Sequence, residues 1–315
     1  MVDDVCFGAG VLTEGLDFEK VKAFCLNAEK LGYELFNIED HLMSQNLNPI
    51  GPHPLECWTT LAGLAAVTDK IRLGPTVTCY GYRRPTILAK MATNLDIISK
   101  GRLVFGIGAG WHEPEFKAFM GRFPSKRERL RGLEESIEIC KSMFSNERTT
   151  YRGRIYDVDD VLNSPQPVQK PIPIMVGGSG EKVTLRIAAK HADISHIMSR
   201  GLIEDKRKFS ILREHCKAVS RDYDDIVKGI GFGTFIGHSE DEARSKAIEW
   251  AKSGGVPPEF MEKYLRERTP AFGAPESFVE AFKSYIDEGI TLFTCFFHDL
   301  DDMQLFAEDV IPRVL

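Results

Sequence analysis

The sequence lacks the features that mark secreted, membrane and nucleic-acid-binding proteins. It begins with the short acidic stretch MVDDV, and no long apolar run follows, so we expect neither a signal peptide nor a membrane span. The 40 lysines and arginines form no long run and are outnumbered by 46 acidic residues, which gives a net charge of −6. We therefore predict a cytoplasmic protein whose partner is a small molecule, with no nucleic acid and no membrane.

The cysteines and histidines also lack the spacing of a metal site. The seven cysteines are scattered, odd in number and without a Cys-x-x-Cys pair, so we expect reduced cysteines that pack in the core. A metal hydrolase on a barrel fold would need a His-x-His pair after the first strand, where Phe7-Gly8-Ala9-Gly10 stands instead. We predict no metal.

What the chain does contain is a repeated alternation of short apolar runs and amphipathic segments, which is typical of βα units around a parallel sheet. We predict eight strands, at residues 5–9, 34–38, 71–78, 103–107, 172–176, 192–198, 230–236 and 291–297. Eight units in 315 residues favour an α/β fold, a closed (β/α)8 or TIM barrel formed by residues 1–315 as a single domain. The interval of about 239–288 is long for one crossover and is broken by prolines, which predicts an insertion between strands 7 and 8. No pattern in it identifies a ligand.

Local signals mark several element ends. Asp17 can cap a helix that Gly32 ends, and Pro85 can open another. Ser125 and Glu128 have the spacing of a capping box. The polar segment 149–160 predicts a surface hairpin.

The segment 101–121, GRLVFGIGAGWHEPEFKAFMG, carries the most functional information. Its apolar run leads into alternating glycines, which let a backbone approach a flat or bulky ligand, and then directly into Trp111-His112-Glu113. An active-site loop and an ordinary strand with a glycine turn are equally good interpretations of the spacing alone. A dinucleotide fingerprint fails because Trp111 stands where its third glycine belongs.

A second glycine cluster, Gly177-Gly178-Ser179-Gly180, precedes a helix that we expect to begin near Glu181. Unpaired amides at a helix start can bind a phosphate without a cationic side chain. The alternative is a plain turn in which Ser179 is the N-cap. The sequence favours the phosphate site.

Both segments resemble signatures of the luciferase-like monooxygenase superfamily, in particular its deazaflavin (coenzyme F420)-dependent branch, where GRL-x-x-G-x-GAGWHE-x-E recurs. Residues 165–192, PQPVQKPIPIMVGGSGEKVTLRIAAKHA, are similar to the second signature of that branch. NIEDHL at 37–42 and LGPTVT at 73–78 occupy the places of its acidic-His pair and strand-end turn. The resemblance thins after about Ser199.

This resemblance implies an oxidoreductase that transfers a hydride between the deazaflavin C5 and an unidentified small organic substrate. It places His41 near the reactive ring and the cofactor phosphate near the second glycine cluster, and it implies a non-prolyl cis peptide at Thr76-Val77. Imidazole titrates near neutrality, and an adjacent carboxylate can hold its tautomer, so His41 and Asp40 are the predicted catalytic residues. A surface histidine beside a loop carboxylate is the alternative.

The βα loops of a barrel open on one face, so five strand-end loops are expected to meet there. The predicted cofactor-binding residues are Thr76, Val77, Thr78, Gly108, Ala109, Gly110, Gly177, Gly178, Ser179 and Gly180. The predicted substrate pocket consists of Trp111, His112, Glu113, Tyr80 and His196. Some deazaflavin dehydrogenases have a proton-donating Glu where Trp111 stands, and this departure argues against their sugar-phosphate chemistry.

Two other functions remain open at this point. Glycine turns bind the phosphate of FMN equally well, and reduced FMN with O2 would make the protein a two-component monooxygenase with a reductase partner. A non-catalytic flavin-binding protein is the third hypothesis. The resemblance also implies a homodimer.

Overall fold

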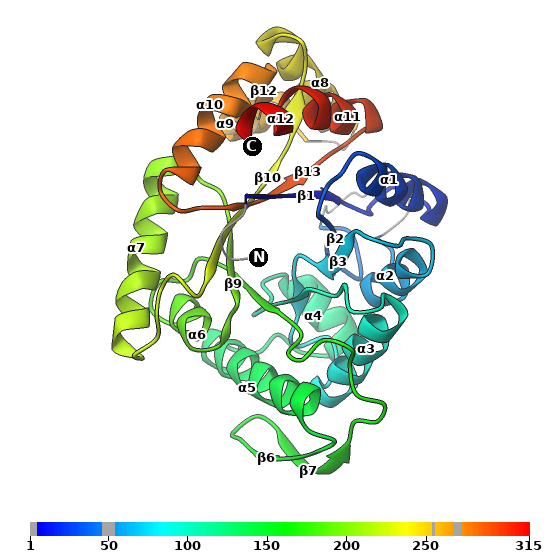
Figure 1. Cartoon of the computed structure of the whole chain (residues 1–315), viewed down its shortest axis with the longest axis vertical. Coiled ribbons are helices and arrows are strands. Elements are labelled where there is room, and N and C mark those ends of the chain that lie inside the picture. Colours follow the sequence, from blue (N-terminus) through cyan, green and yellow to red (C-terminus); the bar gives the residue numbers. More distant parts are fainter. Residues whose placement is uncertain (1–4, 46–53, 254–255, 268–271) are drawn as a thin grey trace.

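The centre of the molecule is a ring of parallel strands surrounded by helices (Figure 1). A computed structural model describes the chain except for residues 1–4, 46–53, 254–255 and 268–271. The ring strands are β1 (Cys6–Val11), β2 (Leu35–Ile38), β3 (Arg72–Pro75), β4 (Thr78–Cys79), β5 (Phe105–Gly108), β8 (Ile174–Gly177), β9 (Ile194–Met198), β10 (Val227–Gly233) and β13 (Leu292–Phe296). These nine strands fill eight positions, because β3 and β4 are two parts of one interrupted strand.

The strands follow the order β3-β2-β1-β13-β10-β9-β8-β5-β4, and every neighbouring pair is parallel. An isolated parallel bridge between Leu73 and Leu103 joins the two ends of this order. The predicted TIM barrel is confirmed. The third strand, expected to be continuous over 71–78, is instead split at Thr76-Val77, where the peptide bond is cis.

Two glycines allow the close approach of backbones at this closure. A Cβ on Gly74 would lie 2.2 Å from the carbonyl oxygen of Val104, and one on Gly106 would lie 2.1 Å from that of Pro75. Neither position can hold a side chain unless the strands separate. These contacts explain why glycine is needed at both positions where the barrel closes.

Helices cover the outside of the barrel, and their ends follow the local signals. They are α1 (Phe18–Lys30), α2 (Cys57–Ala65), α3 (Pro85–Ile98), α4 (Glu113–Met120), α5 (Lys126–Ser145), α6 (Thr184–His191), α7 (Leu202–Ala218), α10 (Pro275–Ile286), α11 (Leu300–Asp309) and α12 (Ile311–Val314). Asp17 caps α1, and Ser125 and Glu128 form both bonds of the capping box of α5. The helix expected near Glu181 begins three residues later, because residues 181–183 form a turn.

The long interval between the last two barrel positions contains the predicted insertion. Its elements are α8 (Glu240–Ser253), α9 (Pro258–Glu267) and β12 (Phe272–Gly273), and α10 follows. The strand expected at 230–236 ends in the barrel at Gly233, and β11 (Phe235–Ile236) leaves the ring to pair with β12. The hairpin is formed by β6 (Arg148–Arg152) and β7 (Asp157–Leu162).

All seven cysteines are free and buried. In the described part of the chain, no helix has both the length and the apolar character needed to cross a bilayer.

We predict that Gly74→Ala shifts the midpoint of urea unfolding to lower concentration by the equivalent of roughly 1–3 kcal/mol, because the new methyl group collides with a backbone carbonyl. The matched control is Gly63→Ala in α2, where the Cβ would meet only the ring edge of the partly exposed Phe18 at 3.1 Å. Alanine is also the better helix former, so the control should differ from the parent by less than about 1 kcal/mol. Equal stability of the two variants would contradict the closure argument.

Candidate active site

A cavity of about 370 Å³ opens at the carboxyl ends of the barrel strands. We call it the inner cleft. The two predicted catalytic residues and all ten predicted cofactor-binding residues line it, together with Trp111 and His196. The strand-end loops therefore converge as expected from the barrel.

The glycines at the bottom of the inner cleft make room for Val77. A Cβ at either Gly108 or Gly177 would lie 2.7 Å from a methyl carbon of Val77. The Thr76-Val77 segment, whose peptide bond is cis, thus packs against the glycines at the ends of β5 and β8. Sequence reasoning assigned Gly108 to contact with a flat or bulky ligand and Gly177 to the phosphate-binding turn, and the structure gives both of them a packing role as well.

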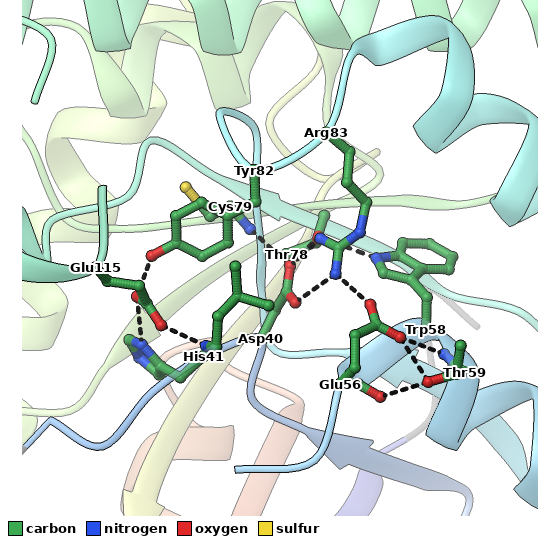
Figure 2. Close-up of polar contacts among 11 residues, drawn as sticks. Asp40, His41, Glu56, Trp58, Thr59, Thr78, Cys79, Tyr82, Arg83 and Glu115 are labelled. Atoms are coloured by element: carbon green, nitrogen blue, oxygen red, sulfur yellow. Dashed lines mark hydrogen bonds and ion pairs between the residues drawn. The ribbon is translucent and has the colours of Figure 1, made fainter. Parts of the chain in front are cut away.

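His41 is held by a buried carboxylate from α4, not by its neighbour in sequence. Its Nδ1 lies 3.0 Å from Oε2 of Glu115 (Figure 2). The carboxylate also accepts bonds from the Tyr82 hydroxyl and from the amides of Leu42 and Met43. Burial opposes ionisation of Glu115, but the bonds from His41, Tyr82 and Leu42 outweigh it and lower its pKa to about 2. An ionised carboxylate has no proton to donate, so Nδ1 carries the hydrogen and Nε2 is left to exchange a proton.

Asp40 belongs to a second network on the other side of the loop (Figure 2). Arg83 donates to both of its oxygens, at 2.7 and 3.0 Å, and also pairs with Glu56. The Thr78 hydroxyl donates to Asp40 at 2.5 Å. Burial disfavours the charge on Arg83, but its bonds to Asp40 and Glu56 raise its pKa above the usual range. The prediction that Asp40 orients His41 is therefore wrong, because its oxygens face Arg83 and Thr78.

Three of the predicted pocket residues do not line the inner cleft. Glu113 is exposed and pairs with Lys117 at 2.7 Å. Tyr80 is buried against α5, where a Cβ on Gly132 would lie 2.2 Å from its ring. His112 lies behind His41, with ring centroids 6.0 Å apart, and its Nδ1 is 3.7 Å from Glu115. Strand and helix geometry, unknown from sequence, turns these side chains away.

His196 forms part of the cleft wall. Its Nε2 lies 2.7 Å from the Thr294 hydroxyl oxygen inside the barrel. Burial lowers its pKa to about 4, so the ring is neutral near pH 7 and contributes a polar but uncharged surface.

The second glycine cluster lines the cleft as a turn and not as a helix start. The Gly178 amide donates to the carbonyl of His196 at 2.9 Å and is therefore engaged. A Cβ on Gly180 would lie 2.7 Å from the Thr184 hydroxyl oxygen, so this turn must be bare. A phosphate would meet the turn itself, three residues before α6.

One cluster at the site has the composition of a metal site. Ligand atoms of His41, His112 and Glu115 lie within 4.8 Å of one another. Oε2 of Glu115 already accepts bonds from His41 and Tyr82, so we interpret the cluster as a hydrogen-bond network. The absence of a metal stays a prediction.

A second cavity of about 640 Å³, the outer cavity, adjoins the inner cleft and shares Glu39, His41, Thr76, Trp111 and Met198 with it. The insertion supplies much of its wall through Trp250, Phe260, Met261 and Tyr264. The sequence of the insertion identified no ligand, whereas the structure places part of the insertion at a cavity beside the inner cleft.

Sequence reasoning missed Glu115, Tyr82 and Arg83. Glu115 is the last residue of the GAGWHE-x-E motif and lies three positions after His112, so helical spacing was a usable signal for it. Tyr82 and Arg83 follow a strand end without any pattern that distinguishes them from loop residues.

Fold and cleft together define a TIM-barrel protein with its site at the carboxyl ends of the strands. Residues 2–288 match the family described as luciferase-like monooxygenase, and the chain belongs to this family of oxidoreductases. It is 26% identical to an F420-dependent glucose-6-phosphate dehydrogenase from Microbacterium testaceum, over 98% of this chain and 97% of that protein. It is 33% identical to the pyrimidine monooxygenase RutA from Acinetobacter baylyi, but over only 48% of this chain and 40% of that protein.

Solved structures of similar shape confirm the fold. An F420-dependent secondary alcohol dehydrogenase has a TM-score of 0.83 at 18% identity, with 99% of each chain covered. The EDTA monooxygenase from Chelativorans sp. BNC1 has a TM-score of 0.82 at 15% identity, over 99% of this chain and 93% of that one. At these identities the likeness extends to the fold alone.

We predict that Glu115→Gln lowers the free energy of unfolding at neutral pH by about 2 kcal/mol, because an amide replaces an ionised acceptor of several hydrogen bonds. Folding lowers the pKa of Glu115 from 4.5 to about 2. Its stabilisation is therefore fully present above the ordinary value and is lost as pH falls through the lowered one.

Urea unfolding across a series of pH values checks this prediction. The difference between parent and Glu115→Gln should be constant near neutrality and shrink in acid. Glu113→Gln, on the same helix but exposed, should match the parent throughout. A difference that persists unchanged in acid would show that Glu115 does not act through its charge.

Proposed function

We propose that the protein is an F420-dependent oxidoreductase that transfers a hydride between the deazaflavin C5 and a small organic substrate. The observation that carries the proposal is the inner cleft, where the Thr76-Val77 segment, the bare glycine turn and His41 face one space. The full-length similarity to an F420-dependent dehydrogenase supports the choice of cofactor.

The residues present fit such a group. The Thr76–Thr78 segment and the Gly108–Gly110 loop would pack against a flat ring, and the Gly177–Gly180 turn would hold the phosphate through backbone amides. No lysine or arginine is found among the described residues that line the cleft, so backbone dipoles are the available anion donors. When bound, the deazaflavin supplies or accepts the hydride, and the protein contributes orientation and proton handling.

His41 is the proposed proton-transfer residue. The ionised Glu115 fixes its Nδ1 as the donor, which presents Nε2 for exchange with a substrate hydroxyl or carbonyl. Asp40 acts indirectly. Its bonds to Arg83 and Thr78 hold in place the loop that follows β2. It is a positioning residue in this proposal.

An FMN-dependent monooxygenase is the second candidate, and the 33% identity to a pyrimidine monooxygenase favours it. In that case reduced FMN would use O2, and a reductase would supply the reduced flavin. The same glycine turn would hold its phosphate. A protein that binds a flavin without catalysis is the third candidate. In such a protein the Glu115–His41 network would have no catalytic role.

The choice between cofactors is tested by anaerobic titration of the purified protein with deazaflavin coenzyme and with FMN, each oxidised and reduced, monitored by tryptophan quenching. We expect a Kd for the deazaflavin that is in the micromolar range and at least about tenfold below that for FMN, the equivalent of 1.4 kcal/mol. Tighter binding of reduced FMN, together with O2 consumption, would support the monooxygenase instead. Binding of neither cofactor would refute both.

Once a substrate is found, His41→Ala should lower kcat by roughly 10²–10⁴ while the cofactor Kd changes little, because general acid–base catalysis is lost and the cleft remains. His238→Ala, at an exposed position outside both cavities, is the matched control and should behave like the parent. Full turnover by His41→Ala would exclude the proton-transfer role.

A further inference from the structure

The outer cavity gathers more exposed apolar side chains than the inner cleft, with which it shares Trp111 and Met198. Four of the large apolar side chains that remain exposed in the described structure line it, namely Trp111, Met198, Trp250 and Phe260. Phe260 is 64% exposed and Trp111 is 62% exposed. Exposed apolar side chains gathered around one opening mark a surface that a ligand covers.

The described lining of this cavity lacks the permanently charged basic side chains. Among the described residues that line it there is no lysine or arginine. His298 lies between Phe235, on which it stacks, and Trp250, which is tilted against it, with ring centroids 4.4 and 4.3 Å away. Burial lowers the pKa of His298 to about 3, so this ring is neutral near pH 7. A phosphate or carboxylate on a ligand would meet no lysine or arginine among the described lining residues, and His41 already faces the ionised Glu115.

Two buried oxygen atoms without partners lie where the cavities meet. Glu39 is 6% exposed, and its Oε1 accepts bonds from the amide and hydroxyl of Thr13 at 2.7 and 2.9 Å. Its Oε2 and the hydroxyl oxygen of Thr76 are buried and have no hydrogen-bond partner among the described residues. Both residues line both cavities. Buried polar atoms without partners in a protein point to a bound group that satisfies them.

The environment of Glu39 suits a neutral ligand. Burial raises the pKa of its carboxyl group, against the bonds from Thr13 that lower it. Within the described parts of the chain, no lysine or arginine bonds to it. An unpartnered carboxyl oxygen in this position can exchange hydrogen bonds with an uncharged oxygen or nitrogen.

We propose that the outer cavity binds the substrate, that this substrate is an uncharged, mainly apolar molecule, and that its one polar group is hydrogen-bonded by Glu39 Oε2 and Thr76 Oγ1 beside His41. This inference rests on the proposed function for the identity of the site, and it names the substrate class. It excludes sugar phosphates and other anions as substrates, although the full-length relative from Microbacterium testaceum is named for glucose 6-phosphate.

Three matched probes test the proposal by isothermal titration calorimetry on the protein saturated with its preferred cofactor. The ketone 4-phenylbutan-2-one is nearly isosteric with the anion 3-phenylpropanoate, and 2-phenylethyl phosphate places a phosphate on the same aromatic body. We expect the ketone to bind at least about tenfold more tightly than either anion. Equal or tighter binding of an anion overturns the proposal.

Variants locate the binding. Phe260→Ala should weaken the ketone by roughly tenfold, since it removes an exposed aromatic wall without touching the barrel. Phe119→Ala, which is also exposed but lies on α4 outside both cavities, should leave its affinity unchanged. An unchanged affinity in Phe260→Ala places the ketone elsewhere and refutes the assignment.

Glu39→Gln should retain ketone binding, because the amide also exchanges hydrogen bonds, whereas Glu39→Leu should weaken it by about tenfold. Thr76→Val, a substitution of similar shape, should also weaken ketone binding. It tests the assigned contacts even if Glu39→Leu does not fold. Unchanged affinity in Thr76→Val and in a folded Glu39→Leu contradicts the assigned contacts.

The two proposals fail separately. If neither cofactor binds, the proposed function is refuted, and the same probes are then titrated into the cofactor-free protein. Preference for the ketone that depends on Phe260 supports the cavity chemistry even then. Tight cofactor binding combined with preference for the phosphate probe refutes the substrate class alone.

Discussion

One buried carboxylate holds the loops of the site together. Glu115 accepts hydrogen bonds from the loop after β2, through His41, Leu42 and Met43, and from the segment after β4, through Tyr82. Its own helix follows β5. Three strand-end loops are thus tied to one group, and the donors from these loops together offset its burial. The position of His41 is consequently a property of the whole barrel mouth and not of its own loop.

The two cavities divide the work between the barrel and the insertion. The inner cleft is built from strand ends and glycines, which give bare backbone and a fixed shape. The outer cavity owes its aromatic wall to the insertion and meets the cleft at Glu39, His41 and Thr76. In our account the barrel binds the cofactor and the insertion selects the substrate, so a change of substrate would need changes mainly in α8 and α9.

The sequence predicts the barrel well because the relevant signals are local. Alternating apolar runs identify the strands, and Asp17, Ser125 and Glu128 mark helix ends through bonds made within a few residues. The site was predicted less completely, because the hydrogen-bond partners of its side chains depend on the direction in which each side chain points. Asp40 and His41 are neighbours in the chain, but their side chains reach Arg83 and Glu115 respectively. Successive residues at the end of a strand face opposite sides. The sequence alone does not show which partner each of these side chains reaches.

The insertion was the least predictable part. Trp250 and Phe260 lie on separate helices, and only their packing beside the barrel mouth brings them to one cavity. No periodicity within either helix carries that information. The split of the third strand at Thr76-Val77 likewise depends on contacts with Gly108 and Gly177, which are more than 25 residues away in the chain.

The most direct test of the account is a crystal structure of the protein with the deazaflavin cofactor bound. We predict that the ring lies against the Thr76-Val77 segment, with the phosphate within hydrogen-bond distance of the backbone amides of Ser179 or Gly180. The Glu115–His41 contact should be retained at about 3 Å. A cofactor ring in the outer cavity, or a phosphate away from the glycine turn, would contradict the account.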